Sequence, residues 1–274
     1  TYCIIPYTRG RVRSRKREDV IREVTVLAQN GYQEVVLTGI HLSSYGRDLE
    51  EGNTLLELVE AVAAVEGISR IRLGSLEPGI ITEAFAKRLA SIPEICPHFH
   101  LSLQSGCDAT LKRMNRKYTT ADYREKCRIL RDCFDNPALT TDVIAGFPGE
   151  TEEEFQTSLA FVDDMDFYET HIFKYSRRQG TKAADMPGQI TGAVKTERSG
   201  RYQELNRKKQ EQYEKSWAGK RAEVLFEDTF TGEGGSVWRT GHTREYLKVA
   251  VPAKEARMNE RKWIEIVNPV QIIH

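Results

Sequence analysis

The sequence has few cysteines, no net charge and no long apolar run. Its five cysteines among 274 residues form an odd set without regular spacing, which argues against a disulfide framework and favours a reducing, cytoplasmic location. No apolar stretch reaches the roughly 18 residues that a membrane-spanning helix needs, so we expect no membrane partner. The first residues also lack the basic-then-apolar order of a secretory signal. Hydrophobic residues make up 39% and charged residues 29%, which is typical of a globular protein with a core.

The formal net charge is zero, yet basic residues gather in three places. The clusters are Arg9, Arg11, Arg13, Arg15, Lys16 and Arg17; then Lys112, Arg113, Arg116 and Lys117; then Arg198, Arg201, Arg207, Lys208, Lys209 and Lys215. Basic patches on a neutral protein are what local contact with a polyanion requires. Solvated helix faces produce the same pattern, so both interpretations stay open.

Short apolar strands alternate with amphipathic helical stretches through the first two thirds of the chain. The expected strands are 34–38, 71–75, 99–104, 139–145 and 171–175. Strand–helix alternation predicts a parallel sheet, and no G-x-G-x-x-G fingerprint follows the first strand. We therefore expect an α/β fold with a barrel or partial barrel rather than a doubly wound sheet.

Local signals mark the ends of two of the expected helices. The apolar positions of 20–28 fit one helix face, and Asn30-Gly31 is a typical stop. Thr151 followed by Glu154 is typical of a capping box that opens a helix. These signals place helices before the first strand and after the fourth.

In a barrel the reactive groups follow the carboxyl ends of the strands. In this sequence those positions hold glycine, proline and small polar residues, in 38–41, 75–78, 104–106, 142–150 and 175–176. Asp142 is a carboxylate in an otherwise apolar strand, and a buried carboxylate needs partners. We predict that these loops form the site.

The pattern changes after a charged helical stretch that runs from Lys195 to about Trp217. Short alternating strands are expected at 222–227, 236–239, 246–251 and 262–267, with a glycine-rich turn at 232–235. This predicts a small antiparallel β-barrel. We place the two domains at 1–214 and 215–274.

Six motifs, in order, resemble those of the radical S-adenosylmethionine methylthiotransferases. They read EVVLTGIH from Glu34, RLGSLEP from Arg72, HLSLQSGC from His100, MNRKYT from Met114, DVIAGFPGET from Asp142 and YSRRQGT from Tyr175. The C-terminal strands are similar to the TRAM RNA-binding module that ends members of this family. The resemblance implies a partial (β/α)6 TIM-like radical-SAM barrel followed by a TRAM domain.

The family binds a [4Fe–4S] cluster through a C-x-x-x-C-x-x-C motif whose last cysteine follows an aromatic residue. Tyr2-Cys3 fits that ending, so the resemblance makes Cys3 a metal ligand. Three thiolates hold three irons and leave the fourth open to S-adenosylmethionine. The other two cysteines and a front domain with a second cluster would precede Thr1. We therefore expect this chain to be a fragment that is inactive by itself.

The resemblance also implies how S-adenosylmethionine is bound. Asp142 would accept hydrogen bonds from the ribose hydroxyls, and Arg116 would face the methionine carboxylate. Backbone groups near Thr38 would take the amino group, and Gly146 would admit the adenine close to the backbone. The implied cofactor-binding residues are Tyr2, Thr38, Gly39, Ser75, Gln104, Arg116, Asp142 and Gly146, with Ser75 a weaker candidate; no catalytic side chain is assigned.

A different metal site is the alternative for the histidine-rich strand. Cys96, His98 and His100 could supply zinc ligands, but their spacing follows strand alternation and matches no usual zinc ligand set. The remaining cysteines, at 107, 127 and 133, are expected in core or incidental positions.

The implied function is methylthiolation of tRNA. The TGIH loop that ends at His41 is similar to that of the subfamily acting on threonylcarbamoyladenosine at position 37, where a 5′-deoxyadenosyl radical would abstract the hydrogen at adenine C2. The anticodon-loop base must be splayed out to reach a barrel mouth, and the TRAM domain with the basic clusters would hold the phosphates. His41 and Tyr45 are candidates for substrate contact, and for His41 a purely structural hydrogen bond is an equal alternative. The sequence does not specify the sulfur donor or the reductant.

Four other functions stay open on the residues alone. Two lie within the family: a methylthiotransferase acting on isopentenyladenosine in tRNA, or one acting on a ribosomal-protein aspartate. The others are a non-catalytic RNA-binding protein that keeps the barrel as a scaffold and a barrel enzyme without radical chemistry. The intact Ser75, Gln104, Arg116 and Asp142 count against the scaffold, because RNA binding alone needs no such pocket.

Overall fold

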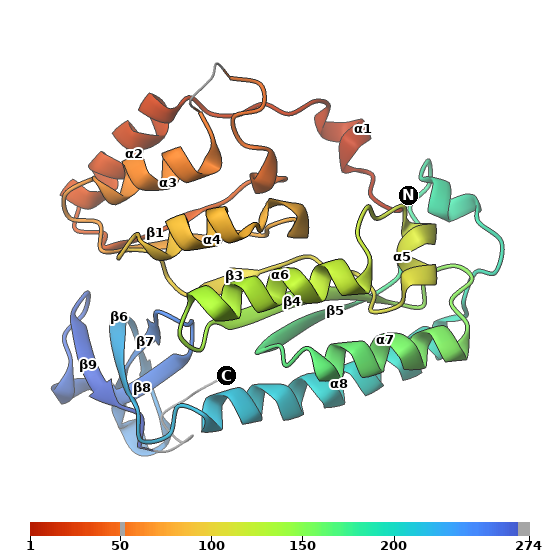
Figure 1. Ribbon diagram of the computed structural model, residues 1–274. Helices are drawn as coiled ribbons and strands as arrows, with labels where there is room; N and C mark the ends of the chain where they lie inside the picture. Colours follow the sequence, from red (N-terminus) through yellow and green to blue (C-terminus); the bar gives the residue numbers. More distant parts are fainter. Residues whose placement is uncertain (50–52, 268–274) are drawn as a thin grey trace.

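The computed structural model describes residues 1–49 and 53–267, and five parallel strands form its central sheet (Figure 1). These strands are β1 (Glu34–Leu37), β2 (Arg70–Leu73), β3 (His98–His100), β4 (Ala138–Ala145) and β5 (Glu169–Lys174). β1 pairs with β2, and β3, β4 and β5 pair in sequence order. Backbone hydrogen bonds from Ile71 N to Glu94 O (2.7 Å) and from Leu76 N to His100 O (2.8 Å) join β2 to β3. The strands therefore follow one another in chain order, which confirms the expected α/β barrel-like fold.

Helices connect the strands and cover one face of the sheet, as the strand–helix alternation predicts (Figure 1). The helices are α1 (Ile5–Arg9), α2 (Arg17–Gln29), α3 (Leu55–Ala63), α4 (Glu83–Ala90), α5 (Asp108–Met114), α6 (Thr120–Cys133), α7 (Glu152–Asp164) and α8 (Gly192–Lys215). α2 ends at Asn30 as expected, and Thr151 with Glu154 forms the predicted capping box of α7. Leu, Ile, Val and Phe side chains fill the layer between the helices and the strands.

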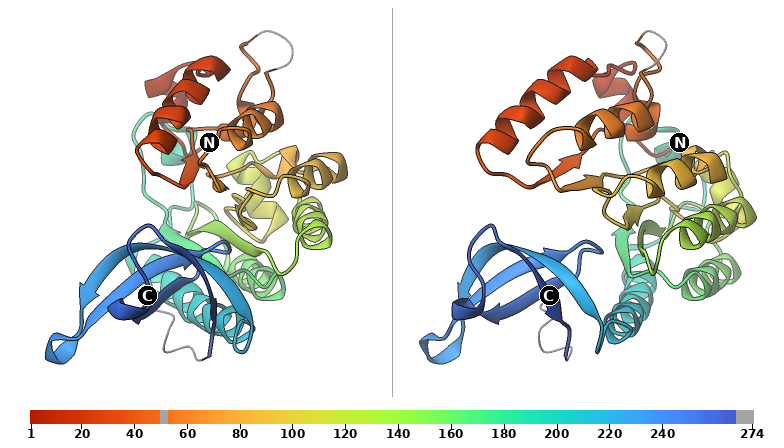
Figure 2. Two further views of the ribbon diagram at one scale, coloured as in Figure 1. Left: turned by 90° about the vertical axis from the view of Figure 1, so that its left-hand side faces the viewer. Right: turned by 60° about the vertical axis from the view of Figure 1, so that its left-hand side comes forward.

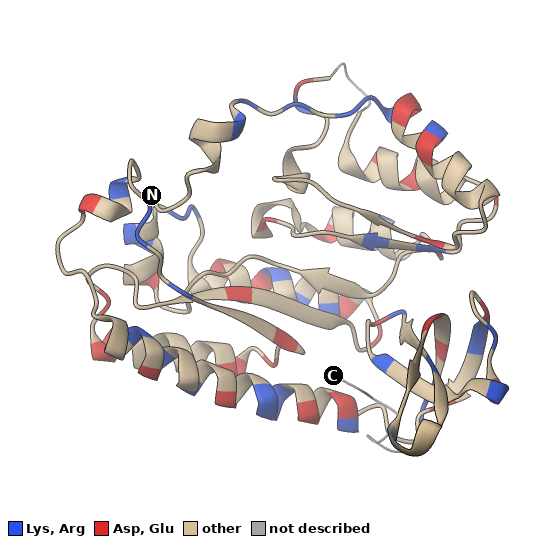
Figure 3. Cartoon of the chain, turned by 180° about the vertical axis from the view of Figure 1, so that it is seen from behind, with Lys and Arg blue, Asp and Glu red and all other residues tan. Residues whose placement is uncertain are grey.

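The other face of the sheet is polar. Side chains alternate along each strand, so that Leu139, Val143 and Ala145 of β4 are buried in the core. Asp142, between them, projects to the opposite face. Figure 3 shows the chain from behind, with the positions of acidic and basic residues coloured along the strands. This polar face is the inner surface of the barrel.

Several element bounds differ from the sequence expectation: β6 (Arg221–Thr231) and β7 (Val237–Thr243) continue further than expected, and β3 and α8 have other bounds than expected. β3 spans only three residues instead of 99–104, because Ser102 donates its backbone N–H to Leu76 on one side while Gln104 donates to Asp142 on the other. Gln104 has a left-handed backbone (φ 73°), which ends the regular strand. α8 begins at Gly192, before Lys195, because the Thr191 side chain accepts from the Val194 N–H.

The C-terminal residues form a four-stranded antiparallel sheet, which we call the β module. Its strands are β6 (Arg221–Thr231), β7 (Val237–Thr243), β8 (Lys248–Pro252) and β9 (Arg261–Glu265), in the order β8-β7-β6-β9. Glycine is required at position 241, since a Cβ there would lie 2.0 Å from the Leu225 carbonyl oxygen. The expected antiparallel β domain is thus present, and α8 leads directly into it. The boundary at 214/215 stays a prediction.

The β module packs against the N-terminal ends of the barrel strands (Figures 1 and 2). Its apolar core includes Ala138, the first residue of β4, and Tyr168, which precedes β5. Gln33, before β1, donates to the Asn259 carbonyl oxygen (2.6 Å). The module therefore closes the end of the barrel that lies opposite the predicted site loops. Within the described ranges, no helix combines the length and apolarity required to cross a bilayer.

Candidate functional site

A chain of hydrogen bonds crosses the mouth of the barrel, at the carboxyl ends of the strands. Arg116 donates to Glu77 Oε1 (2.9 Å) and to the Tyr2 hydroxyl (2.6 Å), and Tyr2 donates to Gln104 Oε1 (2.9 Å). Glu77 Oε1 also lies 3.9 Å from His41 Nε2. The loops after β1, β2 and β3 are thereby tied to the N-terminal segment. Tyr2, Gln104 and Arg116, three of the predicted cofactor-binding residues, lie in contact, and their role stays a prediction.

Arg116 stays cationic in this setting. Burial opposes its charge, but Tyr118, Tyr2 and Glu77 outweigh the burial and raise the pKa of the Arg116 guanidinium. The Tyr118 ring lies under this guanidinium, 5.9 Å from ring centroid to Cζ, and its hydroxyl donates to the Ser102 carbonyl (2.8 Å). Burial also raises the pKa of the Tyr2 phenol, which keeps it protonated as a donor. The site therefore offers a fixed cation with neutral hydroxyls around it.

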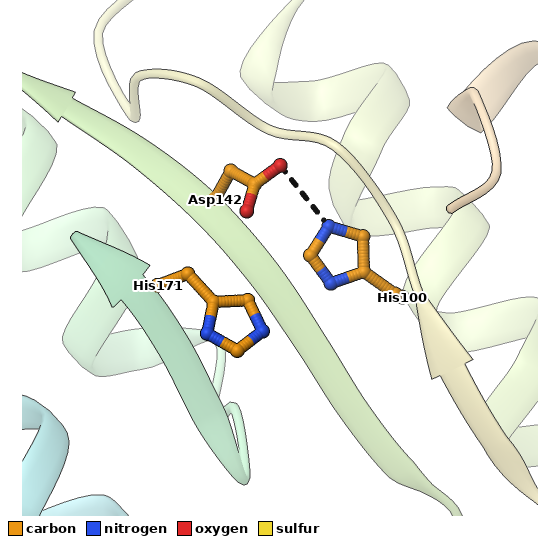
Figure 4. Close-up of side chains that lie close together, drawn as sticks. All are labelled: His100, Asp142 and His171. Carbon is orange, nitrogen blue, oxygen red and sulfur yellow. Dashed lines mark ion pairs between the residues drawn. The ribbon is translucent and has the colours of Figure 1, made fainter. Parts of the chain in front are cut away.

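A second polar group lies on the inner face of the strands (Figure 4). His100 of β3, Asp142 of β4 and His171 of β5 come together, with potential ligand atoms all within 4.8 Å of one another. Asp142 Oδ2 lies 3.2 Å from His100 Nε2, but the two groups are not aligned for a hydrogen bond. This buried nitrogen therefore has no hydrogen-bond partner among the described residues. The two imidazole rings stack at 5.4 Å. A buried nitrogen without a partner beside a carboxylate is what a polar ligand in the barrel would satisfy.

The register of the sheet makes this group. Asp142 pairs with His171, and Thr140 pairs with His100, so all four face inward at neighbouring positions. Thr140 Oγ1 also lies 3.1 Å from His100 Nδ1 and orients the ring. Sequence analysis missed His171 as a site residue and noted His100 only as a zinc candidate. The sequence did contain one indication of this group: each of the three successive expected strands carries a histidine or a carboxylate next to its apolar residues.

The loop after β4 is fixed from behind by a buried ion pair. Glu150 accepts from the Gly146 backbone N–H (2.9 Å) and from Arg198 of α8 (2.8 Å), and its side chain is fully buried. Burial raises the pKa of the Glu150 carboxyl. Gly146 has a left-handed backbone (φ 73°), and a Cβ there would lie 2.5 Å from Lys195 Cγ. The predicted adenine-side glycine is therefore required by the packing of α8.

The other predicted binding residues do not join these groups. Thr38, Gly39 and Ser75 are exposed on their loops. Among the described residues, no hydrogen bond involves the side chains of Thr38 and Ser75. Tyr45 is half-buried and its hydroxyl is likewise unpaired within the described ranges. His41 is held by Ser44, whose Oγ lies 2.5 Å from Nδ1.

The cysteines supply one accessible thiol at the mouth. Cys3 is exposed next to Tyr2, whereas Cys96, Cys107 and Cys127 are buried and Cys133 lies at the far end of α6. Burial raises the pKa of Cys96 to about 11 and that of Cys127 to about 12, so both remain protonated. The alternative zinc set of Cys96, His98 and His100 is wrong: in the part of the chain that the structure describes, the one group with metal-ligand spacing is His100, Asp142 and His171.

The three basic clusters prove unequal. Each member of the α8 cluster pairs with an acidic residue: Arg198 with Glu150, Arg201 with Glu152, Arg207 with Glu211, Lys208 with Glu204, Lys209 with Asp163 and Lys215 with Glu211. In the second cluster, Arg113 pairs with Glu154 and Arg116 with Glu77. Acids on α8 itself, on α7 and in the loop after β4 therefore pair with every member of the third cluster, which is less available to phosphates than the first. That the clusters hold RNA phosphates stays a prediction.

Comparison with known proteins defines the class. A family model for the radical SAM superfamily matches residues 1–162, and the chain belongs to this superfamily. Members use S-adenosylmethionine together with an iron–sulfur cluster. Coproporphyrinogen III oxidase from Escherichia coli, a radical SAM enzyme, has a similar fold with a TM-score of 0.52 at 13% identity, covering 86% of this chain and 62% of that chain. At this identity the likeness concerns the fold alone.

Two curated relatives are named as tRNA-modifying enzymes. The chain is 45% identical over 227 residues to the tRNA-2-methylthio-N(6)-dimethylallyladenosine synthase of Thermoanaerobacter sp. (strain X514), which covers 83% of this chain and 48% of that protein. It is 39% identical over 267 residues to the threonylcarbamoyladenosine tRNA methylthiotransferase MtaB of Bacillus subtilis, which covers 97% and 59%. The chain thus spans about half the length of the curated relatives it matches.

Proposed function

We propose that the protein to which this chain belongs is a radical SAM tRNA methylthiotransferase acting on threonylcarbamoyladenosine. The observation that carries the proposal is the chain of polar groups from His41 through Glu77, Arg116 and Tyr2 to Gln104. It lies at the mouth, where the six sequence motifs meet. The names of the curated relatives support the reaction class.

The residues at the mouth fit S-adenosylmethionine in their chemistry. Arg116 suits a carboxylate, and Asp142, with the unpaired His100 Nε2 beside it, suits vicinal hydroxyl groups. The resemblance places the adenine beside Gly146, which packs against Lys195 of α8 and is followed by the buried Phe147. Cys3, exposed at the mouth, would provide one thiolate for the cluster. When bound, these groups supply one-electron chemistry able to remove hydrogen from an unactivated C–H bond.

The polar mouth favours a polar substituent on the substrate base. A threonylcarbamoyl group carries a carboxylate and a hydroxyl, for which His41 at the mouth is the candidate contact, whereas a dimethylallyl group is wholly apolar. The second candidate, the dimethylallyladenosine reaction, is favoured by the higher identity of the first relative. Both substrates belong to the anticodon loop of tRNA, which we propose as the partner, and a cytoplasmic location agrees with the five free thiols.

The β module is proposed as a TRAM-type RNA-binding domain. Trp263 is 57% exposed, and Phe230 stacks on Trp238 with ring centroids 6.3 Å apart at the β6–β7 turn. Exposed aromatic rings are the usual platform for stacking bases. The module would then bind RNA at the end of the barrel opposite the mouth.

Mass spectrometry of tRNA nucleosides tests the proposal. In cells lacking the full-length gene, 2-methylthio-threonylcarbamoyladenosine is expected to disappear and its unmethylthiolated precursor to accumulate. Complementation with the wild-type gene should restore the product, and an Arg116→Ala gene should not. Persistence of the product would refute the substrate, and loss of the dimethylallyl derivative instead would establish the second candidate.

A further inference from the structure

The β module and the mouth lie at opposite ends of the barrel strands. The module contacts residues that begin strands, such as Arg70 of β2 and Ala138 of β4. The mouth groups follow the strand ends, as Glu77 and Gln104 do. An RNA strand that delivers a base to the mouth has phosphates near the edge of the mouth, which we call the rim. The module lies too far away to contact these phosphates, so cations on the rim itself would have to bind them.

One basic cluster supplies such cations without internal partners. Arg9, Arg11, Arg13 and Lys16 are exposed, and among the residues that the structure describes none of them makes an ion pair. The fifth member of this segment, Arg15, pairs with Glu23. We call residues 9–16 the basic arm. Its positive charge is free, in contrast to that of the α8 cluster.

The basic arm is fixed on the rim. Ser14 donates through its backbone N–H (2.8 Å) and its hydroxyl (2.6 Å) to Asp48, and Ser14 Oγ accepts from the Gly46 N–H (3.0 Å). Both partners lie in the loop after β1, the loop that also carries His41. Figure 3 shows the arm as the segment with Lys and Arg in blue that joins α1 to α2. The free cations are thus held beside the entrance.

The start of the chain fixes the other end of this segment. The Thr1 hydroxyl donates to the Met114 carbonyl (3.1 Å), and the Ala183 N–H donates to the Thr1 carbonyl (3.0 Å). Residues 1–16 therefore run from the loops after β3 and β5 to the loop after β1. The segment follows the edge of the mouth instead of projecting from it.

We propose that the basic arm binds the phosphodiester backbone of the RNA strand whose base enters the mouth. Arginines stand at alternate positions from Arg11 to Arg15, beyond the end of α1. A fully extended chain would place alternate residues about 6.6 Å apart, close to the phosphate step of a nucleic-acid strand. Arginine binds phosphate with a bidentate fork. The choice of tRNA as the source of the strand rests on the proposed function, whereas the RNA-binding surface does not.

The test compares two double variants of the full 274-residue chain. The first, Arg11→Ala with Arg13→Ala, removes two free cations of the arm. The matched control, Arg207→Ala with Lys208→Ala, removes two paired cations of α8. The probe is a fluorescent RNA hairpin of anticodon-arm sequence without modified bases, and its Kd is measured by anisotropy over a series of KCl concentrations.

The arm variant is expected to weaken binding about tenfold or more near 0.1 M salt. Its slope of log Kd against log[KCl] should fall by about 1.4, because each lost contact to a single-stranded phosphate removes about 0.7. The control should keep the wild-type slope. Equal slopes for the arm variant and the wild type, or no binding by the wild type, would overturn the proposal. Thermal melting of both variants verifies that neither has lost its fold.

These outcomes are independent of the proposed reaction. The binding assay needs neither the cluster nor S-adenosylmethionine. A reduced slope combined with unchanged tRNA nucleosides in the deletion strain would refute the reaction and keep the arm. Loss of the modified nucleoside from the deletion strain, combined with an unchanged salt slope of the arm variant, would support the reaction and refute the role of the arm.

Discussion

Tyr246 of the β module stacks on His98 of the barrel, with ring centroids 4.9 Å apart and planes 18° from parallel. The ring of Tyr246 also lies 4.5 Å from that of His242 and under the guanidinium of Arg72, which is 4.7 Å from its centroid. Tyr246 occupies the turn between β7 and β8. A side chain of the module thus fills the N-terminal end of the barrel, and module and barrel are expected to unfold together.

Replacing Tyr246 should loosen this contact. Tyr246→Ala removes two stacked pairs and a cation–π contact, each worth roughly 0.5–1.5 kcal/mol, so we expect a loss of about 1–3 kcal/mol in the free energy of unfolding. Tyr246→Phe keeps the ring and should therefore be as stable as the wild type. Position 246 has a left-handed backbone (φ 75°) in both variants, so the comparison of alanine with phenylalanine reports the contribution of the ring. Urea denaturation followed by tryptophan fluorescence measures the effect. If alanine and phenylalanine gave the same midpoint, the stacked contact would not stabilise the interface.

The fluorescence signal is well placed, because the three tryptophans, Trp217, Trp238 and Trp263, all lie in or next to the β module. Detachment of the module before the barrel unfolds would appear as a fluorescence change that precedes the loss of helical circular dichroism. Coincident transitions in the Tyr246→Phe chain and separated ones in the Tyr246→Ala chain would demonstrate the coupling directly.

The strongest polar contact between module and barrel is buried. Arg70, fully buried, donates to Glu223 Oε1 (3.0 Å) and to the carbonyl of His242 (2.9 Å), and lies 3.6 Å from Glu34. Glu223→Ala leaves the guanidinium undercompensated and should cost about 3 kcal/mol or more. Glu223→Gln, which keeps the acceptor, should cost less.

A control on an exposed arginine separates burial from charge. Arg128 of α6 pairs with Glu125 and Asp132 at the surface, and its side chain is 54% exposed. Arg128→Ala is expected to leave the denaturation midpoint unchanged, because surface pairs are largely solvated. An equal loss for Arg128→Ala and Glu223→Ala would contradict the role of burial.

His98 should make the stability of the protein depend on pH. Burial, with Arg72 nearby, lowers the pKa of His98 from 6.5 to about 3. Between about pH 6.5 and pH 3, His98 is therefore protonated in the unfolded chain and neutral in the folded chain. This residue's contribution falls by up to about 1.4 kcal/mol per pH unit as the pH drops through that window, and it is constant above it.

The comparison variant is His98→Phe, which keeps a ring against Tyr246 and removes a buried Nδ1 that has no partner among the described residues. The difference in unfolding free energy between this variant and the wild type should widen in favour of phenylalanine from pH 6.5 to pH 4.5. A difference that does not vary with pH would show that His98 titrates normally.

Gly146 should not tolerate a side chain. Gly146→Ala meets a left-handed backbone and Lys195 Cγ at 2.5 Å, so we expect a loss of about 1–3 kcal/mol. Lys195→Ala in the same chain removes the clash but leaves the backbone strain. The double variant should therefore be more stable than the sum of the single effects, and strictly additive effects in a double-mutant cycle would contradict the clash.

Arg116 is predicted to bind the carboxylate of S-adenosylmethionine. Arg116→Ala should weaken binding about 10–100-fold, since a charge-assisted hydrogen bond contributes roughly 1.5–3 kcal/mol. Arg113→Ala, three residues earlier in the last turn of α5 and paired with Glu154, should leave the affinity unchanged. Calorimetric titration of the anaerobically reconstituted full-length protein measures both. Equal affinities for the two variants would place the carboxylate elsewhere.

The order of the parallel strands and the positions of the loops follow from the sequence. Period-2 and period-3.6 apolar patterns are local, and a helix of ordinary length between two strands leaves them parallel. The capping box of Thr151 and Glu154 is local as well, and the structure has it where the pattern indicates. Tyr2, Gln104 and Arg116 are predicted as binding residues on a different ground, the resemblance of the motifs that contain them to those of a family.

The inner face could not be read in this way. His100, Asp142 and His171 come together only through the register of β3, β4 and β5, which hydrogen bonds between distant segments set. Shifting one strand by a single residue would turn its side chain into the core. The sequence of one strand does not specify which residue of the neighbouring strand it pairs with, so the register could not be predicted.

The sequence by itself determined the class of fold, the loops of the site and the presence of three basic clusters. Only the tertiary structure decided which cluster keeps its charge. Arg198 meets Glu150, 48 residues away, and the cations of α8 are neutralised, while Arg11 and Arg13 on the rim meet no acid within the described residues. The physical reason is that an ion pair depends on distance in space. Acids four residues away on α8 pair with Arg207, Lys208 and Lys215, whereas the fold brings Glu150, Glu152 and Asp163 to Arg198, Arg201 and Lys209.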